Sequence, residues 1–478
     1  MAVRPARSGG GMSGPLLRLA RHVADRPADW GADLDHAAAR TFVDTVACML
    51  AGRDDPATRG VRAAFAPWTA PGPAPEVASG TRIAAPTAAL VNGTAAHALD
   101  FDDVLEPAAA HASAVFVPAL LALGTERGAS GAQLADALLM AFDVMAAFAA
   151  AMNMAHYDRG WHTTLTFGPI AAAAGCARLM RLDAARAAVA LSAATSFSSG
   201  SKRQFGSDMK PIHAGLAAQA GIVAARLAET GMSAAGEAIL DGRWSFPDLF
   251  GGADMPGLGA LVARLEGPPA MAAFGAWVKA YPCCASAHRP MDALKLLRQS
   301  EGFVPDAVAA VVAEVSAIVH GNLMYRDPAT PMEARFSLNH CLAIVARKDR
   351  VEAADFAPAA LADPDLRAFW PKVSMRIAPD LATPGAPAVG RERARLTVVL
   401  TDGRSLSETV VFPTGHPRMP MADADLAAKF DACAPATPDA AALRDLLFAL
   451  PAAPDLTRIT QLLAAVAAGA AQEKAPSK

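Results

Sequence analysis

The stretch ARLTVVLTDGRSLSETVVF, residues 394–412, decides the fold class because its pattern differs from that of the chain before it. It is rich in valine, alternates in part between apolar and polar residues, and carries TDGR, a hairpin signal of the Asp-Gly type. Two earlier stretches, AVAAVVAEVSAIV (307–319) and PKVSMRIAP (371–379), have a similar texture. The sequence therefore predicts an insert that contains strands, from about residue 276 to residue 415.

The rest of the chain has the periodicity of helices separated by Gly, Pro or Asp. Helices are predicted before the insert at residues 34–52, 86–103, 111–125, 132–155, 169–180, 183–198, 211–230 and 256–265. The first 270 residues are therefore expected to be nearly all helical. Helical patterning resumes at 422–431, 438–449 and 456–471, and we expect these helices to return to the first domain. The fold class that follows is mostly α.

The composition of the 478 residues excludes several classes of protein. The net charge is −3 and the basic residues are dispersed, which argues against nucleic acid or a membrane surface as a partner. The apolar run at 133–155 is interrupted by Asp136 and Asp143, so no membrane span is expected. The six cysteines lack metal-type spacing, and reduced thiols fit a cytoplasmic protein. The first fourteen residues contain no apolar segment, so no secretion signal is expected.

Lys210, in the stretch GSDMKPIHAG, carries a charge that does not suit its position. The proline that follows it marks a helix start, where unpaired N–H groups give a partial positive charge that a cation opposes by about 0.3–1 kcal/mol. His162 and His288 lie at or before helix starts in the same way. Either Lys210 points into water and Asp208 compensates it, or these cations share an anionic ligand. A small polycarboxylate would fit the second interpretation.

A second group of polar residues lies in NGTAAHALDFDDVLEPAAAHASAV, residues 92–115. His97 and Asp100 are three residues apart at a predicted helix end. Asp103 follows after three more, and His111 begins the next helix, so carboxylates and imidazoles converge. Burial among carboxylates is expected to raise the pKa of Asp100. The alternatives are ordinary solvated residues or a metal site, but the spacing of the metal-binding residue types supports no metal. No Gly-rich phosphate loop is present either, so no cofactor is predicted.

These motifs resemble those of the MmgE/PrpD family, in the order NGTAAHALDFDD, HASAVFVPALLAL, GWHTTLTFG, GSDMKPIHAG, YPCC…H and EARFSL. The family includes 2-methylcitrate dehydratases, cis-aconitate decarboxylases and an iminodisuccinate epimerase. The resemblance implies a cofactor-independent enzyme, usually a homodimer, that acts on a small polycarboxylate. It also implies a discontinuous helical domain, residues 15–275 and 420–470, with a smaller α/β lid domain at 276–419. Residues 1–14 and 471–478 are expected to be disordered tails.

The resemblance also assigns residues by motif match. Asp100 and His111 take the places of the family's acid/base pair. The family's carboxylate-contacting residues are matched by His162, Lys210 and Lys279. Two more histidines, in the same motifs, complete the candidates for substrate binding: His213 and His288.

The chain departs from the family pattern at several positions. Val104 stands where Thr or Ser is usual, and Ala112 and Thr163 replace prolines. Asn339 and His340 replace a Pro-Tyr pair, so an imidazole that titrates near neutral pH stands where a phenol is usual. The HASAVFVP segment lacks the HPSDN pattern of 2-methylcitrate dehydratases.

These residues predict a lyase for a small di- or tricarboxylate such as 2-methylcitrate or cis-aconitate, with a hydro-lyase favoured over a decarboxylase. Cations at helix starts would hold the carboxylates, and Asp100 and His111 would move the proton. The alternative is an epimerase of a dicarboxylate, because inversion needs a base on each face and His340 is a candidate for the second catalytic base. A third interpretation is a polycarboxylate binder without activity. A nucleophile at Cys283 or Cys284 is disfavoured, because buried cysteines commonly act as small apolar residues.

Overall fold

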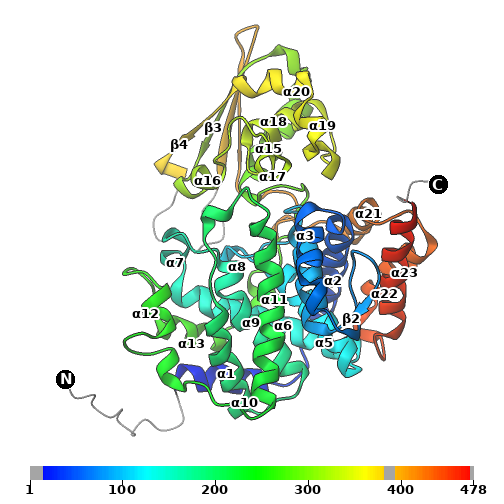
Figure 1. Cartoon of the computed structure of the whole chain (residues 1–478). Coiled ribbons are helices and arrows are strands. Elements are labelled where there is room, and N and C mark those ends of the chain that lie inside the picture. The colour runs from blue at the N-terminus through cyan, green and yellow to red at the C-terminus, as the bar shows by residue number, and fades with distance from the viewer. Residues whose placement is uncertain (1–13, 382–392, 474–478) are drawn as a thin grey trace.

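The computed structural model describes residues 14–381 and 393–473, and it confirms a mostly α protein with a smaller α/β part. Figure 1 shows a large helical body and, above it, a smaller body that contains the main sheet. Each body has its own apolar core. The predicted domain boundaries stay predictions, and most of the two predicted tails falls outside the described residues. Within the C-terminal tail, helix α23 continues to Glu473.

The helical body is built from α1 (Pro15–Asp25), α2 (Ala32–Gly52), α4 (Ala85–His97), α5 (Ser113–Arg127), α6 (Gly131–Met152), α9 (Gly168–Leu179), α10 (Ala184–Ala194) and α11 (Met209–Glu229). Many of its buried positions are alanines, which allow close helix packing. Helices α4 and α11 cross closely, since a Cβ on Gly215 would lie 2.2 Å from the carbonyl oxygen of Leu90. This crossing brings the end of α4 beside the start of α11, and the candidate site lies there.

Shorter helices complete the helical body: α3 (Pro56–Phe65), α7 (Ala155–Asp158), α8 (Thr163–Thr166), α12 (Phe246–Phe250), α13 (Leu258–Glu266) and α14 (Ala270–Ala273). The chain returns to this body through α21 (Asp423–Cys433), α22 (Pro438–Phe448) and α23 (Thr457–Glu473). Figure 1 shows α21 and α22 beside α2, with α23 packed against α22.

The smaller body is a four-stranded sheet with strand order β4-β3-β5-β6. Strand β3 (Val308–Val315) pairs in parallel with β4 (Val373–Ile377) and antiparallel with β5 (Ala394–Leu400). Strands β5 and β6 (Ser405–Val410) form the predicted hairpin, with Gly403 at φ 89° in the turn. The helices of this body are α15 (Ala285–Glu301), α16 (Ala317–Asn322), α17 (Pro331–Ala334), α18 (Leu338–Arg347), α19 (Pro358–Leu361) and α20 (Pro364–Phe369).

Two features of the helical half differ from the sequence predictions. Two short strands, β1 (Pro71–Pro75) and β2 (Arg82–Ile83), interrupt the helical half. Helix α4 ends at His97 instead of residue 103, because Asp100 adopts a left-handed conformation with φ 51° that ends a helix. Helix α6 is long and apolar enough to cross a membrane, but 89% of its apolar window is buried, so it is a core helix of this fold.

Candidate active site

The site begins where the chain leaves α4 and turns through residues 98–112. Asp100, Asp102 and Asp103 lie on this turn and are all buried. The backbone of Val104 pairs with that of Trp277 through two hydrogen bonds of 3.0 Å, which draws the segment leading to the smaller body against the turn. Residues far apart in the sequence therefore surround three buried carboxylates.

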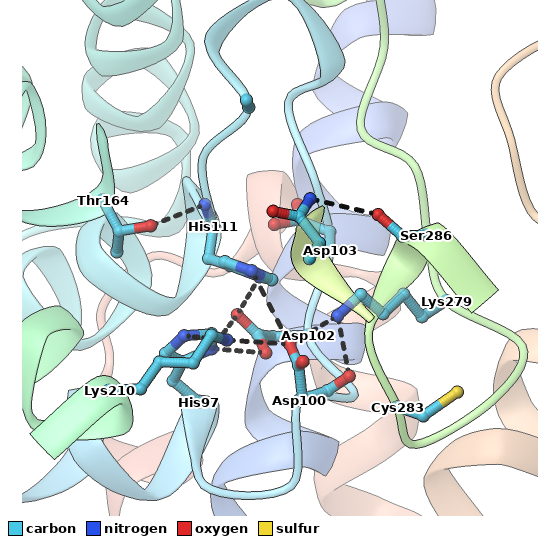
Figure 2. A network of polar contacts seen from close by, with 12 residues as sticks. His97, Asp100, Asp102, Asp103, His111, Thr164, Lys210, Lys279, Cys283 and Ser286 are labelled. Atoms are coloured by element: carbon cyan, nitrogen blue, oxygen red, sulfur yellow. Dashed lines mark hydrogen bonds and ion pairs between the residues drawn. The ribbon is translucent and has the colours of Figure 1, made fainter. Parts of the chain in front are cut away.

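Asp100 is held by two lysines on one oxygen. Its Oδ1 accepts hydrogen bonds from Lys210, at 3.1 Å, and from Lys279, at 2.7 Å (Figure 2). Burial alone would raise the pKa of Asp100, but the two ammonium groups hold it well below its usual range. The sequence expectation of a raised pKa was therefore wrong. That expectation took account of the neighbouring carboxylates but not of the two lysines that contact Asp100 in the folded protein.

The charge of Lys210, which does not suit a helix start, is compensated by a partner inside the protein. The ammonium group is buried beside Asp100 and His97, so it does not point into water. Helix α11 begins one residue before Lys210, and Asp208 caps it without a side-chain hydrogen bond. The anion that compensates Lys210 is therefore Asp100, within the protein.

His97, Asp102 and His111 form a chain of imidazole and carboxylate groups next to Asp100 (Figure 2). Lys210 donates to Nε2 of His97 at 2.9 Å, so Nδ1 of His97 carries hydrogen and donates to Asp102 at 2.9 Å. Nδ1 of His111 lies 3.1 Å from Oδ2 of Asp102, and its Nε2 lies 3.6 Å from Oδ1 of Asp100. Burial lowers the pKa of His111 to about 3. His111 is thus a neutral imidazole at neutral pH.

His162 and His213 form a second imidazole pair, with 2.9 Å between their Nδ1 atoms. Burial lowers the pKa of both, that of His213 to about 4. Nε2 of His162 is buried and has no hydrogen-bond partner among the described residues. A buried polar atom of this kind costs about 1–3 kcal/mol unless a ligand satisfies it.

These groups border a cavity with about 780 Å³ of empty space, part of it open to solvent. Its polar lining includes Asp100, Glu106, His111, His162 and Lys210, and its apolar lining includes Val104, Met154, Phe205, Trp277, Ile318 and Phe336. Lys279 lies behind Asp100, and His213 lies behind His162. The structure therefore brings six of the eight predicted site residues together at this cavity.

The remaining two predicted residues lie elsewhere. His340 is in the core of the smaller body, where its Nε2 lies 2.8 Å from the backbone oxygen of Asp355 and its ring packs against Phe356 and Trp370. The prediction that it is a catalytic base is corrected, because the first turn of α18 directs it into that core. His288 lies in the first turn of α15 with Nε2 3.3 Å from the backbone oxygen of Cys283, and it does not line the cavity.

Sequence reasoning missed a second buried ion pair behind the site. Lys429 of α21 contacts Asp44 of α2 at 2.6 Å and donates to the backbone oxygens of Phe101, at 2.8 Å, and Lys279, at 3.0 Å. Phe101 adjoins Asp100, so this one ammonium group holds the backbone at both Asp100 and Lys279. The sequence pattern that could have revealed this pair is the position of Lys429 between Leu426 and Phe430, the buried apolar residues of α21.

Two overlapping sets of side chains are close enough to hold a metal ion, with candidate ligand atoms within 4.8 Å of one another: His97, His111 and His162, and His97, Asp100, Asp102 and His111. The neighbouring cations oppose a metal. The ammonium group of Lys210 lies 2.9 Å from His97, and that of Lys279 lies 2.7 Å from Asp100. A divalent cation would meet two buried positive charges at contact distance. These donors fit the lysines better than a metal, and independence of metal stays a prediction.

Replacing Asp103 with asparagine is expected to stabilise the protein at pH 8 and to change little at pH 4. Burial raises the pKa of Asp103 from 3.8 to about 7, so the folded protein holds this proton more tightly than the unfolded chain and loses stability as the pH rises between those values. The gain at pH 8 should reach about 2–4 kcal/mol. Asparagine can still accept from the backbone N–H of Ser113. Urea unfolding at both pH values measures the effect, and an equal gain at both would contradict it.

The chain combines an α-helical body and a smaller α/β body with buried lysines, imidazoles and carboxylates around one cavity. The chain belongs to the MmgE/PrpD family: its residues 18–258 match the MmgE/PrpD N-terminal domain and residues 281–449 the MmgE/PrpD C-terminal domain. It is 27% identical over 367 residues to cis-aconitate decarboxylase of Homo sapiens, covering 72% of each chain. It is 23% identical over 460 residues to cis-aconitate decarboxylase of Aspergillus terreus, covering 88% of this chain and 90% of the relative.

Proposed function

We propose that the protein is a cofactor-independent lyase that removes a carboxyl group from a small di- or tricarboxylate. The observation that carries the proposal is that Asp100 accepts from two lysines, with the neutral imidazoles of His111 and His162 around the same cavity. The similarity to cis-aconitate decarboxylases supports this class of reaction. We further propose a cytoplasmic homodimer, as the family resemblance and the free cysteines suggest.

Binding of a substrate carboxylate is assigned to Lys210 and His162. Both line the cavity, and Nε2 of His162 lacks a hydrogen-bond partner among the described side chains and backbone groups. His213 can donate to Nδ1 of His162, which leaves the hydrogen of His162 on Nε2, directed to an acceptor. A carboxylate is such an acceptor and adds an ionic contact to Lys210.

Proton transfer is assigned to His111, with Asp100 and Asp102 beside it. The carboxylate of Asp102 favours hydrogen on Nδ1 of His111, so Nε2 is the atom that can exchange a proton with substrate. When the carbon–carbon bond to the leaving carboxylate breaks, its electron pair stays on the substrate carbon and carbon dioxide departs. His111 then passes a proton from solvent to that carbon. The negative charge of the bound substrate raises the proton affinity of His111, whose pKa burial otherwise lowers to about 3.

Decarboxylation suits this cavity better than the dehydration that the sequence favoured. Val104, Met154 and Trp277 give it an apolar lining, which disfavours a charged carboxylate relative to neutral carbon dioxide. Val104 also supplies no hydroxyl group to assist a departing hydroxide. Epimerisation lacks its proposed second base, since His340 lies in the other core.

The test is NMR of the purified protein in deuterated water with cis-aconitate, 2-methylcitrate, citrate, iminodisuccinate and glutaconate, each with and without EDTA. We expect carbon dioxide to form from at least one unsaturated acid, with one deuterium on the product carbon and the same rate in EDTA. A new double bond without carbon loss would instead indicate a hydro-lyase. Deuterium exchange with inversion would indicate an epimerase, and binding without any change would indicate a carrier. Activity lost in EDTA and restored by a divalent ion would move the Asp100 cluster to a metal role.

A further inference from the structure

Glu106 brings a second carboxylate to the cavity, on the same loop as Val104. Its Oε1 accepts from Arg289 of α15 at 2.8 Å, and its Oε2 lies 3.2 Å from Nε2 of His416. The side chains of Arg289 and His416 are only 1% and 2% exposed, whereas that of Glu106 is 12% exposed. The two partners therefore lie inside the protein, and the carboxylate is the member of the group that meets the cavity.

The partners of Glu106 are themselves fixed. Arg289 donates through Nε to the backbone oxygen of Val411 at 2.8 Å, and its guanidinium lies 5.1 Å from the ring centre of Trp277. Nδ1 of His416 accepts from the backbone N–H of Arg418 at 3.0 Å, so Nε2 of His416 carries hydrogen and donates to Glu106. Although burial alone would raise the pKa of Glu106, these two partners lower it. Glu106 is thus an anion at neutral pH, held in a fixed position.

The charges around the cavity limit the charge of its ligand. Among the described residues that line it, Lys210 is the one ammonium or guanidinium group, while Asp100 and Glu106 are both carboxylates. The lining imidazoles are neutral because burial lowers the pKa of His111 and of His162. Lys279 is held by Asp100, and Arg289 by Glu106. Each of the two carboxylates thus has a buried cation of its own, and Lys210 supplies one further positive charge, which is less than the negative charge of a ligand with three carboxylates.

We propose that Glu106, fixed by Arg289 and His416, makes this cavity select dicarboxylates over tricarboxylates. The proposal rests on the proposed function and narrows its substrate to a small dicarboxylate. One carboxylate joins Lys210 and His162, and the other is the leaving group against the apolar lining. A third carboxylate has no cation left to bind and is repelled by Glu106.

Three unreactive acids with one propane skeleton test the proposal: butyrate, glutarate and tricarballylate, which carry one, two and three carboxylates. Isothermal titration at pH 7.5 and low salt should give the tightest binding for glutarate, with tricarballylate at least about tenfold weaker. The variant Glu106→Gln should bind tricarballylate about tenfold more tightly and glutarate within about threefold of the wild type. Glu229→Gln, which makes the same charge change at a partly exposed glutamate paired with Arg127, should alter neither affinity.

Tricarballylate binding as tightly as glutarate to the wild-type protein would overturn the proposal, even if Glu106→Gln does not fold. An equal loss of affinity for both acids in Glu106→Gln would also overturn it, because a purely structural role predicts that result. If cis-aconitate is decarboxylated and tricarballylate binds best, the lyase function stands and the role of Glu106 is wrong. If none of the three acids binds and no acid is turned over, the proposed function fails as well.

Discussion

Replacing Lys279 with methionine is expected to destabilise the protein, whereas the same change at Lys210 should weaken ligand binding and leave the fold nearly intact. Both lysines donate to Oδ1 of Asp100. They differ in their surroundings, since Lys279 also donates to the backbone oxygen of Asp100 at 2.7 Å, while Lys210 lines the cavity. One is held entirely by the protein, and the other is available to a ligand.

The pKa shifts of the two lysines have opposite directions. Burial lowers the pKa of Lys210, and the attraction of Asp100 does not make up the difference. Burial acts on Lys279 as well, but Asp100 and Asp102 raise its pKa above the ordinary value. The contribution of Lys279 to stability is therefore fully present below pH 10.5, its ordinary pKa, and is lost as the pH rises through the raised one. The charge of Lys210 costs the free protein stability at neutral pH.

The measurements are urea unfolding at pH 7.5 and titration with glutarate. Lys279→Met should lower the free energy of unfolding by about 3 kcal/mol, because it breaks a buried pair. Lys210→Met should change it by less than about 1 kcal/mol, since Asp100 keeps Lys279 as a partner and the cost of burying one ammonium group disappears. Glutarate should bind to Lys210→Met about ten- to hundredfold more weakly. A Lys210→Met protein that unfolds more easily and binds glutarate as before would show that this lysine is only a structural partner of Asp100.

The fold could be predicted from the sequence where a local pattern determines it. The Asp-Gly turn between β5 and β6 and the helices α5, α6 and α9 to α11 follow from residues that are neighbours in the sequence. Strands β1 and β2 could not be predicted in this way, because Pro71–Pro75 is rich in proline and becomes a strand only by pairing with Ile83. The end of α4 depends on the left-handed conformation of Asp100, which holds the turn into the site.

The site could be predicted only as a set of residue types. The position of Lys210 at a helix start indicated an anion nearby, and the family resemblance grouped it with Asp100 and Lys279. The anion is Asp100, 110 residues from Lys210 in the sequence, so no local pattern could identify it. Without the contacts to the lysines, the direction of the pKa shift of Asp100 was predicted wrongly. The prediction for His340 failed for the same reason, since no local pattern shows which core its side chain enters.

Lys429→Met is expected to lower both the stability and the activity of the protein, by two separable routes. The change leaves Asp44 as a buried carboxylate without its ammonium partner, which should cost about 3–5 kcal/mol of unfolding free energy. It also removes the donor to the backbone oxygens of Phe101 and Lys279, which fixes the segments that carry Asp100 and Lys279. Loss of positioning at this distance should reduce kcat by about tenfold or more.

The double variant Asp44→Asn/Lys429→Met separates these routes. It removes the unpaired charge, so stability should recover by at least about 2 kcal/mol relative to Lys429→Met, because a neutral amide is far less costly to bury than a carboxylate. It doesn't restore the donor to the two carbonyl groups, so kcat should stay low while KM changes little. Lys295→Met, the same change at a partly buried lysine of α15, is the control and should alter neither quantity by much. If kcat recovered together with stability in the double variant, Lys429 would act only through folding. A kcat that remains low in a protein of restored stability would show that Lys429 of α21 positions the catalytic groups. It would do so by holding the backbone beside Asp100 and at Lys279.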